Sequence, residues 1–325
     1  MAEIKKSKAV NRVGSLIGVF FSLICLGVFI YQIDVKTVVE ALSQFEIQYL
    51  PIAFLGLALG YSIRIYRWCY ILKAVEPNVQ TRACVAPFLA AIALNNVLPF
   101  RMGDIIRAFV FPRSMNISRL NGVGSLLIER ILDLLTILFC FFFSLQVIDK
   151  IQLPEEFILF CQVAMIGVLL AFVFLFLLQK LDLSAYLQKK TRLSELGSNF
   201  VQALALMSDL RLLLMTIVFS LILWCAEAAF YFMILLGFGI EVNSVAALLS
   251  MSVATLSTLI PSAPGFIGAF HIATFAVLSA LGYDEGFSGS AAILIHLALW
   301  GGTTSAGGLM LFLKPELFQM AKTGR

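Results

Sequence analysis

The residues best suited to chemistry in this chain lie beside two proline-containing breaks in otherwise apolar sequence. Around the first break the chain carries Asn96, Pro99, Arg101, Asp104 and Arg107. Asp104 and Arg107 are three residues apart and therefore share one face of a helix, and Arg101 lies one turn behind Asp104. Because the planar guanidinium group of arginine binds phosphate through paired hydrogen bonds, this pattern favours a site for an anionic group.

Four further charged residues lie inside apolar stretches, where a charge costs free energy and rarely faces lipid. Glu129 and Asp133 share one face of a helix, whereas Arg130 points about 100° away from Glu129. Glu227 is a lone acid in a later stretch, and we expect it to pair with one of these arginines or to carry a proton. These side chains form a substrate site, a buried ion-pair network that fixes helix packing, or both.

The second break is small and uncharged. It contains Pro261, Pro264, Gly265, Gly268 and His271. Its glycines allow close backbone approach, and the amides that open the following helix can face an anion. His271 is either a titrating site residue or a hydrogen-bonded packing residue, with packing favoured, and His296 is expected to be structural.

The sequence argues against metal and nucleotide chemistry. It has only two histidines, and its six cysteines stand singly in or beside apolar segments, without the spacing of a zinc site. It contains no P-loop, dinucleotide fingerprint or Ser-His-Asp order. We therefore expect no cofactor, no metal, no catalytic residue and no nucleic-acid partner.

Composition indicates that membrane helices must position these residues. Apolar residues make up 61% of the chain, charged residues 13%, and the mean hydropathy is +0.97. A soluble domain carries about 25% charged residues and cannot bury this much apolar surface. We expect the 325 residues to form one all-α transmembrane domain.

Six apolar stretches reach the length of about 20 residues that a membrane crossing requires. They are 13–33, 50–73, 120–148, 157–179, 211–238 and 287–313. Two shorter stretches, 83–98 and 244–260, end at the proline breaks, and we predict that they are re-entrant helices.

The distribution of charge predicts the orientation. The four loops placed outside the cell carry nine acidic residues, against Lys36 and Lys150 as their only cations. Because cytoplasmic loops are enriched in Lys and Arg, both termini are predicted to be cytoplasmic. Arg64 and Arg67 lie near the cytoplasmic end of their span, where snorkelling explains them.

The two breaks share one spacing. Gly103 follows Pro99 by four residues, Gly265 follows Pro261 by four residues, and the two prolines are 162 residues apart. We predict a repeat, about 50–148 and 211–313, that is inverted in the membrane, as in transporters whose broken helices form the substrate site. The predicted hinge residues are Pro99, Gly103, Pro261, Pro264, Gly265 and Gly268. Between the repeats, 182–209 is predicted to be an amphipathic helix on the cytoplasmic surface.

Three segments resemble the lysylphosphatidylglycerol synthase transmembrane-domain family of flippase-like membrane proteins. They are 96–107, 129–133 and 261–270, and the likeness extends over about 10–313. The resemblance implies a lipid-translocating module with these residues near the path of the headgroup. The family usually has Glu at Asp104 and often an acid at His271, and the second departure argues against a purely cationic headgroup. The 325 residues include no soluble aminoacyl-transfer domain, so the resemblance does not imply lipid aminoacylation.

We therefore expect a multi-pass protein of the bacterial or archaeal cytoplasmic membrane that flips an anionic or aminoacylated phospholipid or a lipid-linked intermediate. One alternative is an intramembrane lipid-headgroup transferase with Glu129 or His271 as its base. Another is a membrane partner subunit of a separately encoded synthase or glycosyltransferase. The expected partners are a membrane lipid, such an enzyme, and a second copy of the chain in a homodimer.

Overall fold

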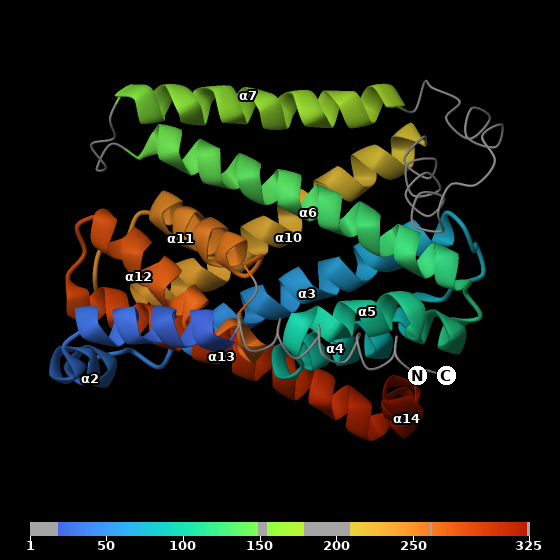
Figure 1. Ribbon diagram of the computed structural model, residues 1–325, viewed down its shortest axis with the longest axis horizontal. Coiled ribbons are helices and arrows are strands. Elements are labelled where there is room, and N and C mark those ends of the chain that lie inside the picture. The colour runs from blue at the N-terminus through green and yellow to red at the C-terminus, as the bar shows by residue number, and fades with distance from the viewer. Residues whose placement is uncertain (1–18, 149–154, 179–208, 261, 324–325) are drawn as a thin grey trace, which may run out of the picture.

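The computed structural model describes residues 19–148, 155–178, 209–260 and 262–323, and every regular element in these ranges is helical (Figure 1). The predicted surface helix 182–209 and the predicted hinge Pro261 lie outside the described residues.

Long helices form where the apolar stretches predict them. They are Val19–Gln32, α3 (Tyr49–Lys73), α6 (Arg119–Val147), α7 (Glu155–Leu178), α10 (Leu210–Leu236) and α13 (Glu285–Leu313). Within the described ranges, α3, α10 and α13 are each long and apolar enough to cross a membrane. A bent pair, Val19–Gln32 with α2 (Val35–Ser43), meets at 80° and adds a fourth candidate. α2 forms where we expected a loop, because the Asp34 carboxylate caps it by accepting from the Lys36 amide.

The first proline break is a turn of 3-10 helix with two left-handed residues. α4 (Thr81–Val97) ends just before the turn Pro99–Arg101, and α5 (Met102–Phe109) follows it. Phe100 and Arg101 have φ angles of 58° and 51°, which are uncommon for residues other than glycine. The chain reverses here, and α5 packs back against α4.

The second break repeats this geometry. α11 (Ser244–Ser257) and α12 (Ala269–Ala280) flank the turn Pro264–Phe266, in which Gly265 and Phe266 have φ angles of 73° and 59°. The prolines that open the two turns are therefore Pro99 and Pro264, which are 165 residues apart. The turn geometry therefore aligns Pro99 with Pro264, three residues after the predicted counterpart Pro261, because the second connection is longer than the first.

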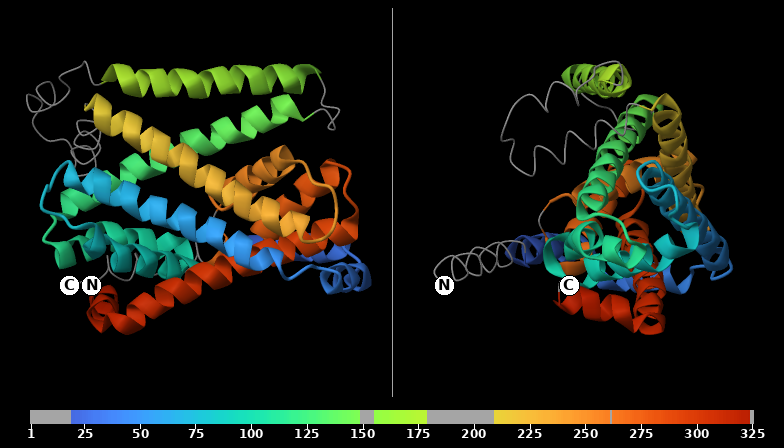
Figure 2. Two further views of the ribbon diagram at one scale, coloured as in Figure 1. Left: turned by 180° about the vertical axis from the view of Figure 1, so that it is seen from behind. Right: turned by 90° about the vertical axis from the view of Figure 1, so that its right-hand side faces the viewer.

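The two most extensive helix pairs run along each other's length, and shorter pairs cross. α3 lies along α10, α4 along α13, and α11 against α6 (Figure 2). A methyl group on Gly56 would lie 3.3 Å from the carbonyl oxygen of Ala226, and one on Gly60 would lie 3.5 Å from that of Leu223. The later residue of α3 thus faces the earlier residue of α10. The two helices are therefore antiparallel and closely packed.

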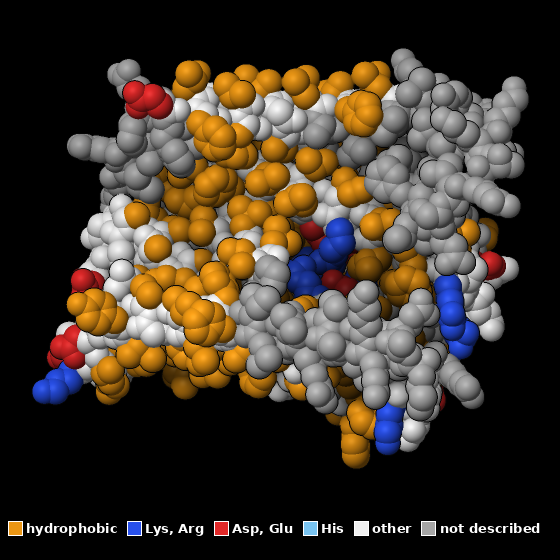
Figure 3. Space-filling view, viewed as in Figure 1, with side chains coloured by type: hydrophobic (Ala, Val, Ile, Leu, Met, Phe, Trp, Pro, Cys, Tyr) orange, Lys and Arg blue, Asp and Glu red, His pale blue; other side chains and the backbone are white. Residues whose placement is uncertain are grey.

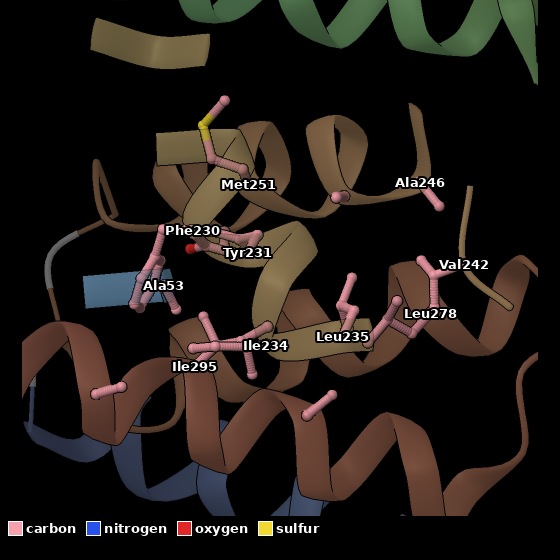
Figure 4. Close-up of a cluster of buried hydrophobic side chains, with 14 of the residues drawn as sticks. Ala53, Phe230, Tyr231, Ile234, Leu235, Val242, Ala246, Met251, Leu278 and Ile295 are labelled. Atoms are coloured by element: carbon pink, nitrogen blue, oxygen red, sulfur yellow. The ribbon is translucent and has the colours of Figure 1, made fainter. Parts of the chain in front are cut away.

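A large apolar core joins α10 to its neighbours and adjoins the charged residues, since it includes Trp224. Tyr231, Ile234 and Leu235 of α10 are fully buried and pack with Met251 of α11 and Ile295 of α13 (Figure 4). The short helix α14 (Pro315–Thr323) joins a separate apolar cluster that includes residues of α4 and α5.

Apolar side chains also cover much of the outer surface. Leu55 is 71% exposed and Phe20 is 67% exposed, and α7 presents a further row of exposed leucine, valine and phenylalanine. Figure 3 shows one face coated with hydrophobic side chains, except for a central hollow where charged side chains gather. Such a coat is costly in water but not in a lipid bilayer.

Two adjacent glycines of α13 give a matched test of this packing. A methyl group on Gly307 would lie 2.1 Å from the carbonyl oxygen of Leu89 in α4, whereas one on Gly308 would meet nothing within 4 Å. We expect Gly307→Ala to lower the free energy of unfolding by about 1–3 kcal/mol through overpacking. Gly308→Ala should leave it unchanged or raise it by up to about 1 kcal/mol. Thermal unfolding in detergent micelles checks this pair, and equal midpoints would contradict the packing of α4 on α13.

Candidate functional site

Charged side chains from four helices meet inside the bundle, at the level of the two breaks. α3 supplies Arg64 and Arg67, α5 supplies Asp104 and Arg107, α6 supplies Glu129, Arg130 and Asp133, and α10 supplies Glu227. All except Arg64 and Arg130 are less than one-tenth exposed. Charges removed from water in this way require partners.

The most deeply buried part of the cluster is built on Arg67 and Arg107, each 1% exposed. Nη1 of Arg67 lies 2.8 Å from Oδ1 of Asp133, and its Nη2 lies 3.6 Å from Oε1 of Glu129. Nη2 of Arg107 lies 2.7 Å from the other carboxylate oxygen of Glu129. Arg107 is also held between two aromatic rings, at 4.9 Å from Trp68 and 4.6 Å from Phe88. These ion pairs bind α3, α5 and α6 together.

A second pair joins α3 to α10. Nη2 of Arg64 lies 2.5 Å from Oε2 of Glu227, and the guanidinium carbon lies 4.1 Å from the centre of the Trp224 ring. The predicted pairing of Glu227 with an arginine is thus realised, although the partner is Arg64. The explanation of Arg64 and Arg67 by snorkelling is wrong, since both point into the bundle and pair with acids.

Two further arginines face the cluster with weaker or no acidic contacts. Arg130 is 38% exposed in its side chain and makes two longer ion pairs, at 3.9 Å to Asp104 and 3.8 Å to Asp133. Arg101 makes no ion pair with any described residue; it donates to the carbonyl and hydroxyl oxygens of Thr258, at 3.1 and 2.6 Å. The four arginines of the cluster match its four acids in number, so Arg101 adds one positive charge in excess.

Polar side chains of α4 fix the first break. Asn95 accepts from the backbone amide of Asp104 at 2.9 Å and donates to its carboxylate at 3.0 Å. Asn96 donates to the hydroxyls of Thr303 and Thr304 on α13, each at 2.9 Å. A methyl group on Gly103 would lie 1.9 Å from the carbonyl oxygen of Ala91, so only glycine permits α5 to lie this close to α4.

The two histidines hold the second break. Nε2 of His296 lies 2.7 Å from the carbonyl oxygen of Gly265, and His296 faces the charged cavity. His271 lies behind it, where Nδ1 accepts from the amide of Gly268 at 3.3 Å. This arrangement agrees with a packing role for His271. It also places His296 nearer to the candidate site than its predicted structural role implied.

A cavity of about 150 Å³ lies beside this cluster. Of the predicted site residues, those that line it are Asn96, Arg101, Asp104, Glu129, Arg130 and Glu227, together with the predicted hinge Gly265. Arg107 and Asp133 sit behind this lining, as partners of the residues that form it. Figure 3 shows Lys or Arg and Asp or Glu side chains in a hollow of the hydrophobic face.

A second cavity, of about 200 Å³, lies between the two breaks. Arg101, Thr258 and Phe266 line both cavities. Arg101 therefore separates the two cavities, where it is held by its hydrogen bonds to Thr258 and by its packing on the Phe266 ring at 5.4 Å.

Apolar helices with an exposed hydrophobic coat, broken helices at two points and a charged cavity inside the bundle define a polytopic α-helical membrane protein. The chain belongs to the family described as the lysylphosphatidylglycerol synthase TM region, which matches residues 15–307. This confirms the resemblance predicted from the three sequence segments.

Three relatives illustrate this membership. The chain is 27% identical to the UPF0104 membrane protein MJ1078 of Methanocaldococcus jannaschii, over 62% of this chain and 85% of that protein. It is 23% identical to the UPF0104 membrane protein PH1989 of Pyrococcus horikoshii, over 93% of this chain and 96% of that protein. It is 26% identical to glycosyltransferase AglD of Haloferax volcanii, over 41% of this chain and only 21% of AglD.

The ion pairs predict different consequences for two arginines of the first break. Arg107→Ala should lower the free energy of unfolding by about 3–5 kcal/mol, because it leaves the buried Glu129 without its closest partner. Arg101→Ala should lower the free energy of unfolding by no more than about 1.5 kcal/mol, since it removes hydrogen bonds but no ion pair. Thermal unfolding measures both values. Replacing Arg107 and Glu129 together by leucine should recover much of the lost unfolding free energy. An Arg107→Ala variant as stable as the wild type would contradict the buried ion pair between Arg107 and Glu129.

Proposed function

We propose that this protein moves an anionic or aminoacylated phospholipid, or a lipid-linked phosphate intermediate, from one leaflet of the cytoplasmic membrane to the other. The observation that carries the proposal is that Arg101 lines the cavity with no ion pair to a described residue, beside Arg130, which is partly exposed and makes only ion pairs of 3.8 and 3.9 Å. In apolar surroundings such charge favours an anion over a neutral group.

The headgroup would be recognised by the residues that line the cavity. Arg101 and Arg130 present guanidinium groups to the lipid phosphate. Asp104 and Glu227 stand in the same lining and would accept hydrogen bonds from an ammonium or hydroxyl group of the headgroup. The single positive charge in excess is balanced when one phosphodiester enters, so the loaded cavity would be electrically neutral.

The arrangement of the helices supports transport by alternating exposure. The order α3, α4, α5, α6 recurs as α10, α11, α12, α13, with a proline turn of the same conformation at the same place. α3 and α10 are antiparallel, as an inverted repeat of one transmembrane domain requires. We propose six crossings, two re-entrant hairpins and cytoplasmic termini. The Arg101–Thr258 contact would open and close the passage between the two cavities.

A relative named a glycosyltransferase supports a second candidate, in which the protein transfers or presents a lipid headgroup for an enzymatic reaction. The charged cavity contains acids that could act as bases, Glu129 among them. Both carboxylate oxygens of Glu129 lie against arginine side chains, at 3.6 and 2.7 Å, so neither is left free to approach a substrate, which favours transport over transfer.

Transport can be measured with the purified protein in liposomes that contain fluorescent phosphatidylglycerol, lysyl-phosphatidylglycerol or polyprenyl phosphate. We expect the wild type to move at least one of these lipids between leaflets. Arg101→Gln should slow movement by about 10- to 100-fold, as expected for a lost charge-assisted hydrogen bond to phosphate. Arg113→Gln, at an exposed position outside the cavity, is the matched control and should keep the wild-type rate.

Two outcomes would overturn the proposal. One is a wild type that moves none of the three lipids, and the other is an Arg101→Gln variant as fast as the wild type. Extracting the same liposomes for mass spectrometry separates the two candidates. Transport leaves the mass of the lipid unchanged, whereas headgroup transfer changes it once a donor is supplied.

A further inference from the structure

An apolar groove lies next to the charged cavity, between α3, α4 and α13. Its volume is about 600 Å³, within the range of about 300–1,000 Å³ typical of small-molecule sites. Phe54, Leu57 and Ile65 of α3 form one wall, and Val85 and Leu89 of α4 form another. The groove contains no charged side chain among its lining residues.

Small residues open this groove to the outside of the bundle. Ala58 and Ser62 of α3 line it and are exposed, and Ala306 lines it from α13. At one end it narrows, because a methyl group on Gly302 would lie 2.9 Å from the ring of Phe54. The groove is therefore reached from the lipid-facing surface.

The groove adjoins the charged cavity. Tyr61 and Thr303 line both spaces, and Thr303 accepts a hydrogen bond from the Asn96 side chain. A molecule with its polar end beside Arg101 and Arg130 and its apolar end in the groove would pass Tyr61, and the lining of the groove would present no further charged group to it.

The dimensions favour a hydrocarbon chain. The lining residues of α3 run from Phe54 to Tyr66, which is about 18 Å of helix. An acyl chain is narrow and extended, and it needs no hydrogen-bonding partner.

We infer that the groove binds one acyl chain of the lipid whose anionic headgroup occupies the charged cavity. The inference rests on the proposed function, since it uses the same lipid and the same cavity. It adds a chain-binding site on α3, α4 and α13, so that recognition depends on the lipid tail as well as on the phosphate.

A photoreactive lipid tests the inference in nanodiscs of phosphatidylcholine. The probe is phosphatidylglycerol with a diazirine in one acyl chain, and labelled residues are located by mass spectrometry of peptides. We expect labelling of 54–66 in α3 and 85–89 in α4 to exceed several-fold that of the exposed face of α7. Phosphatidylcholine with the same diazirine chain should show no such preference.

Two neighbouring substitutions provide the control. Ala58→Phe fills the groove at an exposed position and should reduce its labelling at least fivefold. Leu59→Phe adds an aromatic ring on α3 outside the groove and should leave labelling unchanged. Labelling of the groove no stronger than that of α7, or unchanged by Ala58→Phe, would overturn the inference.

The outcomes also separate this inference from the proposed function. In one outcome the wild type and the Ala58→Phe variant transport lipid at the same rate, and the groove is labelled in neither. The acyl-chain site is then wrong, and the proposed transport function is retained. If the groove is labelled selectively and Ala58→Phe abolishes the label, but no lipid is moved, the acyl site stands and the flippase is wrong.

Discussion

Charges buried among apolar helices must neutralise one another, and this constraint organises the centre of the molecule. Arg67 and Arg107 share Glu129, Arg67 also reaches Asp133, and Arg64 pairs with Glu227. Separating any of these pairs would leave a charge without water or a partner, at a cost of several kcal/mol. The ion pairs therefore fix how α3, α5, α6 and α10 stand relative to one another, more strictly than apolar packing alone would.

The arginines that these close ion pairs do not engage can bind a substrate instead. Arg101 is held by Thr258 and Phe266 from the opposite break, and Arg130 is partly exposed and makes only the longer ion pairs, at 3.8 and 3.9 Å. Both breaks use successive left-handed residues, stabilised by side chains such as Asn95 and His296. A rigid ionic frame thus surrounds a contact between two turns, and that contact is made of hydrogen bonds that water or a phosphate group can replace.

Much of this arrangement follows from the sequence, because long apolar stretches and prolines act locally. The helix positions, the two breaks and most of the charged residues that line the cavity were predicted from hydropathy, proline spacing and charge depth. The roles of Arg64 and Arg67 were not predicted, because their partners lie 163 and 66 residues away along the chain. In the sequence alone, an arginine near the end of a membrane span is equally well explained by snorkelling. The match of Pro99 with Pro264 was missed because Pro261 has the same spacing to a glycine, and it rests on the backbone angles of the turn that Pro264 opens.

The central claim is that uncompensated positive charge inside the bundle binds a lipid phosphate. A cryo-electron microscopy map of the protein in nanodiscs containing phosphatidylglycerol tests it most directly. The account predicts density for a phosphate group between Arg101 and Arg130, continuous with an acyl chain that passes Tyr61. A map that resolves lipids around the outer surface but shows no headgroup in the cavity would contradict it.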